Sequence, residues 1–337
     1  MDYSKLSIVR PPEIDSTWSP EDRLGALRVR FSIGRNRYRV NPGLYRLGSP
    51  GSDSEVFVTA NYKLSFDMLR KNLSGLSAWI LVLETYGINV WCAAGKGTFG
   101  SDELIRQVNN SRLSLYVSHR RLILPQLGAP GVSAQKVKEA TGYLVKFGPV
   151  RAEDIKAYIS AGYRKDELSR TVQFKIKDRL ILTGVEVANS FWYLIIAIIL
   201  FALLSGIHSE GYSLALIWKE GLRAGLYLLA AYLSGAFLAP LLLPFLPFRH
   251  FGGKGMVSGL LVFALIAILG KLDLPLLPLL AWFLISGAIS SYLTMNFTGA
   301  STYTSLSGVR KEMGIFVPVQ IAFTLAGLIL LVIAKLN

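Results

Sequence analysis

The chain of 337 residues contains a single cysteine, Cys92, and only three histidines. One cysteine excludes an intrachain disulfide, and it excludes an iron-sulfur cluster held by this chain alone, because such clusters are normally ligated by several thiolates. A lone thiol also fits a reducing compartment. Cys92 is therefore the one thiol available for chemistry.

Several cofactor motifs are absent. A phosphate-binding P-loop would need a glycine where the sequence has Val90, and a serine or threonine where it has Gly97. Gly95, Gly97 and Gly100 have the spacing of a dinucleotide fingerprint, but no acidic residue ends a strand near position 120. The pattern Asp-x-His-x-x-Gly, which holds cobalt through histidine, is not formed around His119, which we expect to be a surface or hydrogen-bonding residue.

Long apolar stretches fill the second half of the chain. Hydrophobic residues make up 52% of the sequence, and the excess follows Val187. A membrane-spanning helix needs roughly 20 mostly apolar residues, so an all-α transmembrane domain of about five helices is predicted. The helices are expected at 190–207, 222–246, 255–270, 274–295 and 315–334. Because the spans have no acidic residue or lysine near their centres, a proton-coupled transporter is disfavoured.

Basic residues predict the orientation of these spans. Lysine and arginine total 36 against 22 acidic residues, and they gather in alternate loops, which the positive-inside rule makes cytoplasmic. These residues are Arg164, Lys165, Arg170, Lys175, Lys177, Arg179, Arg249, Lys254, Arg310 and Lys311. No secretory signal is recognisable in 1–18. We expect a multi-pass protein of the cytoplasmic (inner) membrane, with its first half in the cytoplasm and no nucleic-acid partner.

The first half alternates strand and helix patterns, which predicts a Rossmann-like α/β domain with a parallel sheet. Strands are expected at 26–38, with a solvated basic face, and at 55–60, 78–84, 88–92 and 121–124. Helices are expected at 66–73 and from Ser101 onward, and the stretches 136–140, 143–147 and 152–160 complete the domain. The predicted domains are a leader 1–22, the α/β domain 23–165, a basic linker 166–189 and the transmembrane domain 190–337.

Cys92 is predicted to lie where the strand 88–92 opens into the glycine-rich turn ending at Gly100. Open α/β domains bind large cofactors at such strand ends. The alternative is a buried structural thiol.

The run Asn-Val-Trp-Cys-Ala-Ala-Gly-Lys, from Asn89 to Lys96, resembles the cap-helix motif of the membrane corrinoid proteins of microbial mercury methylation. These are relatives of the corrinoid iron-sulfur proteins of acetyl-CoA synthesis. Every position matches, and the soluble first half and hydrophobic second half extend the resemblance over most of the chain. The resemblance implies a corrinoid-dependent methyltransferase that passes a methyl group from methyl-cobalt to Hg(II), forming methylmercury. Its cofactor would be a base-off cobalamin-type corrinoid with Cys92 as the lower axial thiolate ligand of cobalt.

The resemblance also implies the corrinoid-binding residues. They are Thr59, Asn61, Asn89, Val90, Trp91, Cys92, Ala93, Ala94, Gly95, Lys96, Gly97, Thr98, Gln126 and Gly128. Thr59 follows from the similar strand end 58–63, and Gln126 from the similar loop 124–131. A strand-capping threonine and ordinary turn chemistry are the alternatives at these two places.

Partners follow from the resemblance too. No iron-sulfur cluster is expected in this chain, so cobalt would need an external reductant, a ferredoxin-like protein with two 4Fe-4S clusters. The methyl donor would be a methyl-folate with its methyltransferase.

A hydroxyl-rich run, 296–310, lies between the last two predicted spans. It resembles a segment of the corrinoid iron-sulfur proteins, so Thr302, Thr304 and Ser305 are candidates for the path of the methyl acceptor. The alternative is helix capping and small-residue packing. Two other functions remain open from the sequence: a corrinoid methyl carrier for a different acceptor, and a membrane thiol protein that senses or carries soft metals.

Overall fold

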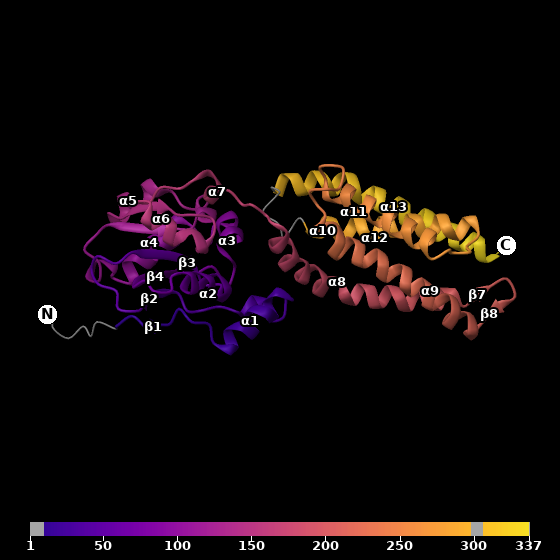
Figure 1. Ribbon diagram of the computed structural model, residues 1–337, viewed down its shortest axis with the longest axis horizontal. Coiled ribbons are helices and arrows are strands. Elements are labelled where there is room, and N and C mark those ends of the chain that lie inside the picture. The colour runs from indigo at the N-terminus through magenta and orange to yellow at the C-terminus, as the bar shows by residue number, and fades with distance from the viewer. Residues whose placement is uncertain (1–9, 298–305, 337) are drawn as a thin grey trace. The chain divides into compact units, whose positions relative to one another are not determined.

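The computed structural model describes residues 10–297 and 306–336. Thr302, Thr304 and Ser305 lie outside the described residues, so the proposed acceptor path has no structural account. The chain forms two compact units (Figure 1). Unit 1 comprises Met1–Val29 and Ile33–Gln173, and unit 2 comprises Arg30–Ser32 and Phe174–Asn337.

Unit 1 is built around a six-stranded sheet with the order β1-β2-β4-β3-β5-β6. The strands are β1 Glu13–Ile14, β2 Gly43–Leu47, β3 Val56–Ala60, β4 Ala78–Leu83, β5 Arg121–Leu124 and β6 Leu144–Phe147. β2 is antiparallel to β4, whereas β4, β3, β5 and β6 are mutually parallel. Every residue of β3 and β4 is buried, which explains their unbroken apolar runs. The predicted Rossmann-like α/β fold is confirmed.

Helices cover both faces of this sheet and form two cores. On one face, β3 contributes Phe57, which packs with residues of α2 Lys63–Asn72 and α6 Ile155–Ser160. On the other face, Val58 belongs to a core shared with α3 Val90–Lys96, α4 Ser101–Asn110 and α5 Ala134–Thr141.

The predicted strand 26–38 is wrong. Most of this stretch is helical, forming the end of α1 Pro20–Arg30 and the 3-10 turn η2 Arg35–Arg37. A reciprocal cap starts α1, because Asp22 N donates to Ser19 Oγ at 3.2 Å and Ser19 N donates to Asp22 Oδ2 at 3.0 Å. Ser19 followed by a proline and an acidic residue three positions on is a helix-start signal that outweighs the apparent alternation.

The predicted strand 88–92 is also wrong. Val90 begins helix α3, and Asn89 caps it by accepting a hydrogen bond from Cys92 N at 2.9 Å. Periodicity alone cannot show whether a short apolar run is a strand or a helix. Here the N-cap residue Asn89 stabilises a helix. Cys92 therefore lies in the first turn of a short helix.

Unit 2 contains five helical stretches long and apolar enough to cross a membrane, as expected. They are α8 Ile176–Ser205, α9 Leu214–Leu233 with its continuation, α11 Phe251–Leu269, α12 Leu276–Asn296 and α13 Leu306–Leu336. The continuation of α9 is a π-helical turn, Ser234–Leu238, followed by α10 Ala239–Leu241. Because α8 and α13 begin earlier than the sequence suggests, they include Glu186 and Glu312, which are 8% and 3% exposed.

Small residues let these helices approach closely. A Cβ on Gly255 would lie 2.4 Å from Thr294 Oγ1, and one on Gly259 would lie 2.4 Å from Ser286 O. Ser290 Oγ donates to Gly255 O at 2.6 Å. The small polar stretch of α12 thus joins α12 to α11.

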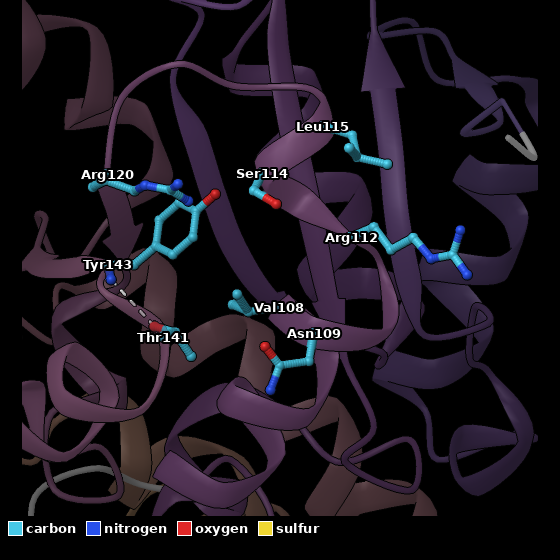
Figure 2. A pocket seen from close by; sticks show the side chains of 8 residues that line it. All are labelled: Val108, Asn109, Arg112, Ser114, Leu115, Arg120, Thr141 and Tyr143. Carbon is cyan, nitrogen blue, oxygen red and sulfur yellow. Dashed lines mark hydrogen bonds between the residues drawn. The ribbon is translucent and has the colours of Figure 1, made fainter. Parts of the chain in front are cut away.

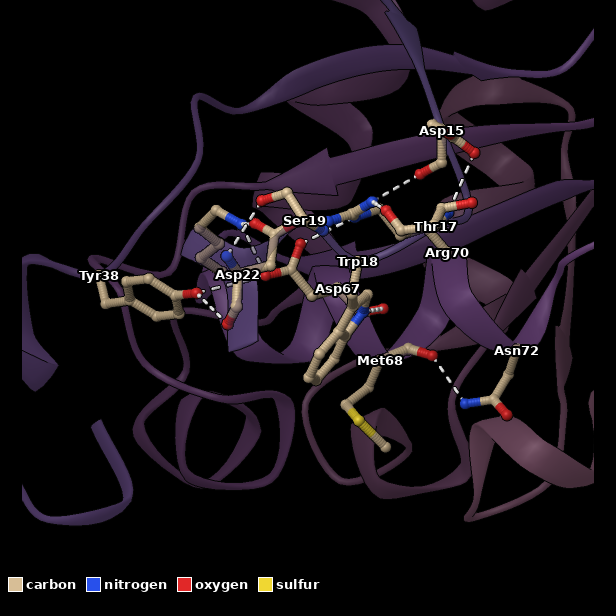
Figure 3. Close-up of polar contacts among 11 residues, drawn as sticks. Asp15, Thr17, Trp18, Ser19, Asp22, Tyr38, Asp67, Met68, Arg70 and Asn72 are labelled. Carbon is tan, nitrogen blue, oxygen red and sulfur yellow. Dashed lines mark hydrogen bonds and ion pairs between the residues drawn. The ribbon is translucent and has the colours of Figure 1, made fainter. Parts of the chain in front are cut away.

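A buried charge cluster fastens α1 to α2 (Figure 3). Arg70 Nε donates to Asp67 Oδ1 at 2.8 Å, and Lys63 Nζ donates to Asp67 Oδ2 at 2.6 Å. Lys63 and Arg70 also pair with Asp22. Arg70 further donates to the carbonyl oxygen of Asp15 at 2.6 Å. Burial opposes the charge on Asp22, but hydrogen bonds from Lys63, the Ser19 amide and Arg70 outweigh it and hold the Asp22 pKa below its usual range.

This cluster predicts a pH-dependent effect of Asp22→Asn. A carboxylate with a lowered folded-state pKa stabilises the fold above its unfolded pKa, and this stabilisation is lost as pH falls through the folded value. We expect the substitution to cost about 2 kcal/mol at neutral pH. The cost should shrink as pH falls below about 4.

Hydrogen exchange of α1 and α2 in the detergent-solubilised protein measures this cost at each pH. Asp102→Asn is the matched control, since Asp102 is 86% exposed in its ion pair with Lys136. A cost that does not change with pH, or an equal cost in the control, would contradict the assignment.

Candidate functional site

The site is assembled at the carboxyl ends of the parallel strands. β3 lies between β4 and β5. The chain therefore passes from β3 to β4 on one side of β3, and then crosses to β5 on the other side. Open α/β sheets bind ligands at such a topological switch point. α3 follows β4 and contacts β3 and the 3-10 turn η4 Gln126–Gly128, which follows β5.

α3 has one buried face and one open face. Val90, Ala93 and Ala94 are 9%, 0% and 5% exposed and belong to the core. On the open side, Cys92 is half-buried with a free thiol, and Gly95 is exposed. A Cβ built on Gly95 would meet no atom within 4 Å. Because residues three apart share a helix face, the thiol lies beside bare backbone that a flat ligand can approach.

Close glycine contacts hold the end of α3 against the loop after β5. A Cβ on Gly131 would lie 2.2 Å from Phe99 O and 3.1 Å from Ala94 Cα. A Cβ on Gly128 would lie 2.5 Å from the Phe99 ring. Gly97 ends α3 with φ 81°, a conformation that favours glycine. Gly97 and Gly128 were predicted to bind cofactor. The fold by itself already favours glycine at both positions.

Asn61 organises the turn that leads from β4 into α3. It is 1% exposed, and its Oδ1 accepts from Thr85 N at 3.2 Å, Thr85 Oγ1 at 2.9 Å and Gly87 N at 2.9 Å. Its Nδ2 donates to Glu84 Oε1 at 2.6 Å. The Asn61 amide is thus engaged within the protein, where it sets the direction in which α3 begins.

The Thr59 side chain lies on the other face of the sheet from α3, and the Gln126 side chain is engaged by Lys165. Side chains alternate along a strand, so Thr59 shares the sheet face of Phe57, whereas Val58 and Ala60 pack in the core that contains Val90. Gln126 Oε1 accepts a hydrogen bond from Lys165 Nζ. Burial, with a smaller contribution from Arg170, lowers the Lys165 pKa.

The remaining predicted residues lie on α3, just after it, or in η4. Trp91 is half-buried and Lys96 is exposed, and the Thr98 hydroxyl donates to Ala93 O at 3.4 Å. The amide of Gly128 donates to Pro125 O at 3.0 Å, within the loop itself. The sequence did not indicate the structural roles of Gly131, Thr85 or Lys165 at this site. Their contacts join segments far apart in the chain, which leaves no local signal.

A pocket of about 440 Å³ opens at the opposite edge of the sheet (Figure 2). It is lined by Val108, Asn109, Arg112, Ser114, Leu115, Arg120, Thr141 and Tyr143. Arg120 and Tyr143 directly precede β5 and β6, so the pocket lies at the amino ends of the parallel strands. The Arg120 guanidinium lies over the Tyr143 ring, 5.0 Å from its centroid. This pocket is distinct from the Cys92 edge.

Metal binding by side chains alone has no candidate among residues 10–297 and 306–336, since no cluster of three or more His, Cys, Asp or Glu occurs there. His119 Nε2 lies 2.9 Å from Ser54 O, which confirms its predicted hydrogen-bonding role.

Residues 20–159 match the family model described as CO dehydrogenase/acetyl-CoA synthase delta subunit. The chain is 30% identical over 146 residues to the acetyl-CoA decarbonylase/synthase complex subunit gamma of Archaeoglobus fulgidus, covering 42% of this chain and 31% of that protein. It is 28% identical over 131 residues to the subunit gamma of Methanopyrus kandleri, covering 38% and 28%. It is 28% identical over 125 residues to the corrinoid/iron-sulfur protein large subunit of Moorella thermoacetica, covering 36% and 28%.

The family model covers the α/β part of the chain. The matched region spans less than a third of each of these relatives, at 31%, 28% and 28% of their lengths. The chain is thus similar to subunits named for acetyl-CoA decarbonylase/synthase and to a corrinoid/iron-sulfur protein, as the resemblance predicted. The mercury-methylating branch of that resemblance stays a prediction.

The role of Asn61 predicts a local defect in Asn61→Ala. The substitution leaves the buried Thr85 and Gly87 amides without an acceptor, which costs about 2 to 4 kcal/mol. Hydrogen exchange should show lost protection in 84–97, while β5 stays protected. Asn72→Ala is the matched control, because the Asn72 side chain makes an exposed hydrogen bond to Met68 O. Unchanged exchange in 84–97 would refute the organising role.

Proposed function

We propose that this protein is a membrane-anchored, corrinoid-dependent methyltransferase with Hg(II) as methyl acceptor. The observation that carries the proposal is the pairing of the Cys92 thiol with the open position of Gly95 on the exposed face of α3. The similarity of unit 1 to a protein named a corrinoid/iron-sulfur protein supports it. The five apolar helices would anchor unit 1 at the cytoplasmic side of the membrane.

A corrinoid fits the residues present. Its macrocycle supplies the equatorial ligands of cobalt, so the protein needs to offer one axial ligand and a flat approach. Cys92 would be that ligand in the base-off form, and Gly95 would leave room for the ring edge. Asn89 and Asn61 would hold the thiol in place, the first by capping α3 and the second by fixing the preceding turn.

The corrinoid and the protein would have different parts in the reaction. When bound, the corrinoid would supply a cobalt-bound methyl group, whose transfer to the soft ion Hg(II) is favoured by electron donation from an axial thiolate. The chain would keep Cys92 aligned, and it would hold the macrocycle at the sheet edge.

Partners are part of the proposal. Cobalt must be reduced between turnovers, and within the described residues Cys92 is the one thiol. A ferredoxin-like protein with two 4Fe-4S clusters would supply the electrons, and a methyl-folate with its methyltransferase would supply the methyl group. The relatives named above include subunits of a complex, which is consistent with a protein that works beside others.

A second candidate function is a corrinoid methyl carrier for a different acceptor. It is favoured by the relatives, which are named for acetyl-CoA synthesis. The two functions share the Cys92 site and differ only in the acceptor, so product analysis separates them. A non-enzymatic thiol sensor of soft metals would bind Hg(II) without binding corrinoid.

Cys92→Ala is expected to change the visible spectrum of the corrinoid-loaded protein and to reduce methylmercury formation to background. The reason is the loss of the axial thiolate. Cobalt content, absorption spectra and mass-spectrometric product analysis give the three readouts, with Ser111→Ala, at the C-cap of α4, as control. Corrinoid binding with an identical spectrum in the variant would refute axial ligation. Methyl transfer to a thiol but not to Hg(II) would favour the second candidate.

Gly95→Val tests the open position beside the thiol. A Cβ at position 95 meets no atom within 4 Å, and valine is tolerated in a helix at least as well as glycine, so the fold should be unchanged. If the corrinoid occupies this space, its affinity should fall by at least about tenfold. Gly314→Val is the matched control, because Gly314 is also helical and also has no neighbour within 4 Å of its Cβ position. Equal corrinoid affinity in the two variants would place the ring elsewhere.

A further inference from the structure

The segment from Arg23 to Arg39, here called the basic segment, contains six arginines and no acidic residue. It comprises most of α1, the turn after it and η2. The proposed site does not use it. Its composition alone does not distinguish a solvated surface from a binding surface, but the positions of its apolar residues do.

α1 presents apolar side chains on two opposite faces. Ala26 and Val29, each 2% exposed, face the interior. Leu24 and Leu27 are 48% and 53% exposed, and Phe31, just after the helix, is 43% exposed. The spacing of three and then four residues puts these three on one stripe. Ile33 extends the exposed apolar surface at 62%.

Arginines flank this stripe. Arg23, Arg28 and Arg37 are exposed, and within the described residues none of them forms an ion pair. A stripe of leucine and phenylalanine bordered by arginines matches the boundary between anionic headgroups and acyl chains. Each arginine near an anionic lipid surface contributes attraction of about 1 kcal/mol.

We infer that the basic segment lies on an anionic lipid surface, with Leu24, Leu27 and Phe31 inserted at the headgroup boundary. This rests on the proposed membrane anchoring by unit 2. Only Phe174 and Lys175 separate the end of unit 1 at Gln173 from α8, so a bilayer spanned by α8 is always within reach. This tether favours lipid over a diffusing acidic protein, because binding to the tethered surface loses little freedom.

The charge cluster gives this contact a structural consequence. Asp22, in the first turn of α1, pairs with Lys63 and Arg70 of α2, and α2 directly follows β3. A helix held on the membrane surface would therefore restrain α2, to which these ion pairs join it.

Spin labels on the full-length protein in nanodiscs test the inference. Three single-cysteine variants in a Cys92→Ala background carry the label at Leu27, at Ile199, and at Glu139 in α5. Ile199 is 54% exposed on α8 and reports the membrane span, while the exposed Glu139 reports water. Power-saturation EPR compares accessibility to oxygen, which concentrates in lipid, with accessibility to a water-soluble nickel chelate.

In nanodiscs containing phosphatidylglycerol, the ratio of oxygen accessibility to nickel accessibility at Leu27 should be severalfold above the ratio at Glu139. The ratio at Ile199 should also be severalfold above the ratio at Glu139. The ratio at Leu27 should fall in pure phosphatidylcholine nanodiscs and in the Arg23→Gln, Arg28→Gln variant. A label at Leu24 repeats the measurement if the Leu27 variant folds poorly.

Three outcomes overturn the inference and identify the fault. A water-like ratio at Leu27 with a lipid-like ratio at Ile199 refutes the surface contact and leaves the anchoring intact. Water-like ratios at both positions refute the anchoring as well. A Leu27 label that is immobilised and shielded from both reagents shows that a protein surface, not lipid, covers the stripe.

Discussion

The amide of Asn61 is the contact on which the geometry of the candidate site depends. Its oxygen accepts hydrogen bonds from the Thr85 and Gly87 amides, and the turn they belong to sets where α3 starts. The Asn89 cap then fixes the first turn of the helix around Cys92. Buried backbone amides cost free energy unless they are paired, so one side chain reaching across from the end of β3 stabilises a turn that could not close by itself. That turn therefore sets the position of the Cys92 thiol.

The sheet could be predicted because its central strands are buried on both faces, which leaves long unbroken apolar runs such as 78–83. The strand Arg121–Leu124 could be predicted for the same reason, and the five apolar helices could be predicted from the length of their apolar stretches. The stretches 26–38 and 88–92 were assigned wrongly because alternation and short apolar runs are weak evidence. In both cases the decisive signal was a cap, at Ser19 and at Asn89. The contacts of Asn61 span more than twenty residues, and no local pattern reveals such partners. The hydrogen bond between Lys165 and Gln126 could not be predicted for the same reason, because it joins residues far apart in the sequence.

The family model matches residues 20–159, within unit 1, and the chain spans less than a third of the relatives. In unit 2, glycine and serine contacts bring neighbouring helices together. The proposed anchoring would replace free diffusion of unit 1 with diffusion confined to the membrane.

The π-helical turn Ser234–Leu238 has a consequence for how unit 2 tolerates change. A π turn accommodates one more residue than an α turn, so it shifts the angular phase of everything that follows by about 100°. Two residues of the turn are held by neighbouring helices: Ser234 Oγ lies 2.8 Å from Ser258 Oγ, and Gly235 O accepts from Thr294 Oγ1 at 3.0 Å. Removing one residue here would leave an ordinary α turn with the following residues in the same phase, whereas removing one from a regular part of α9 would rotate them by about 100°. In this helix the irregular turn is the place where a deletion disturbs the alignment least.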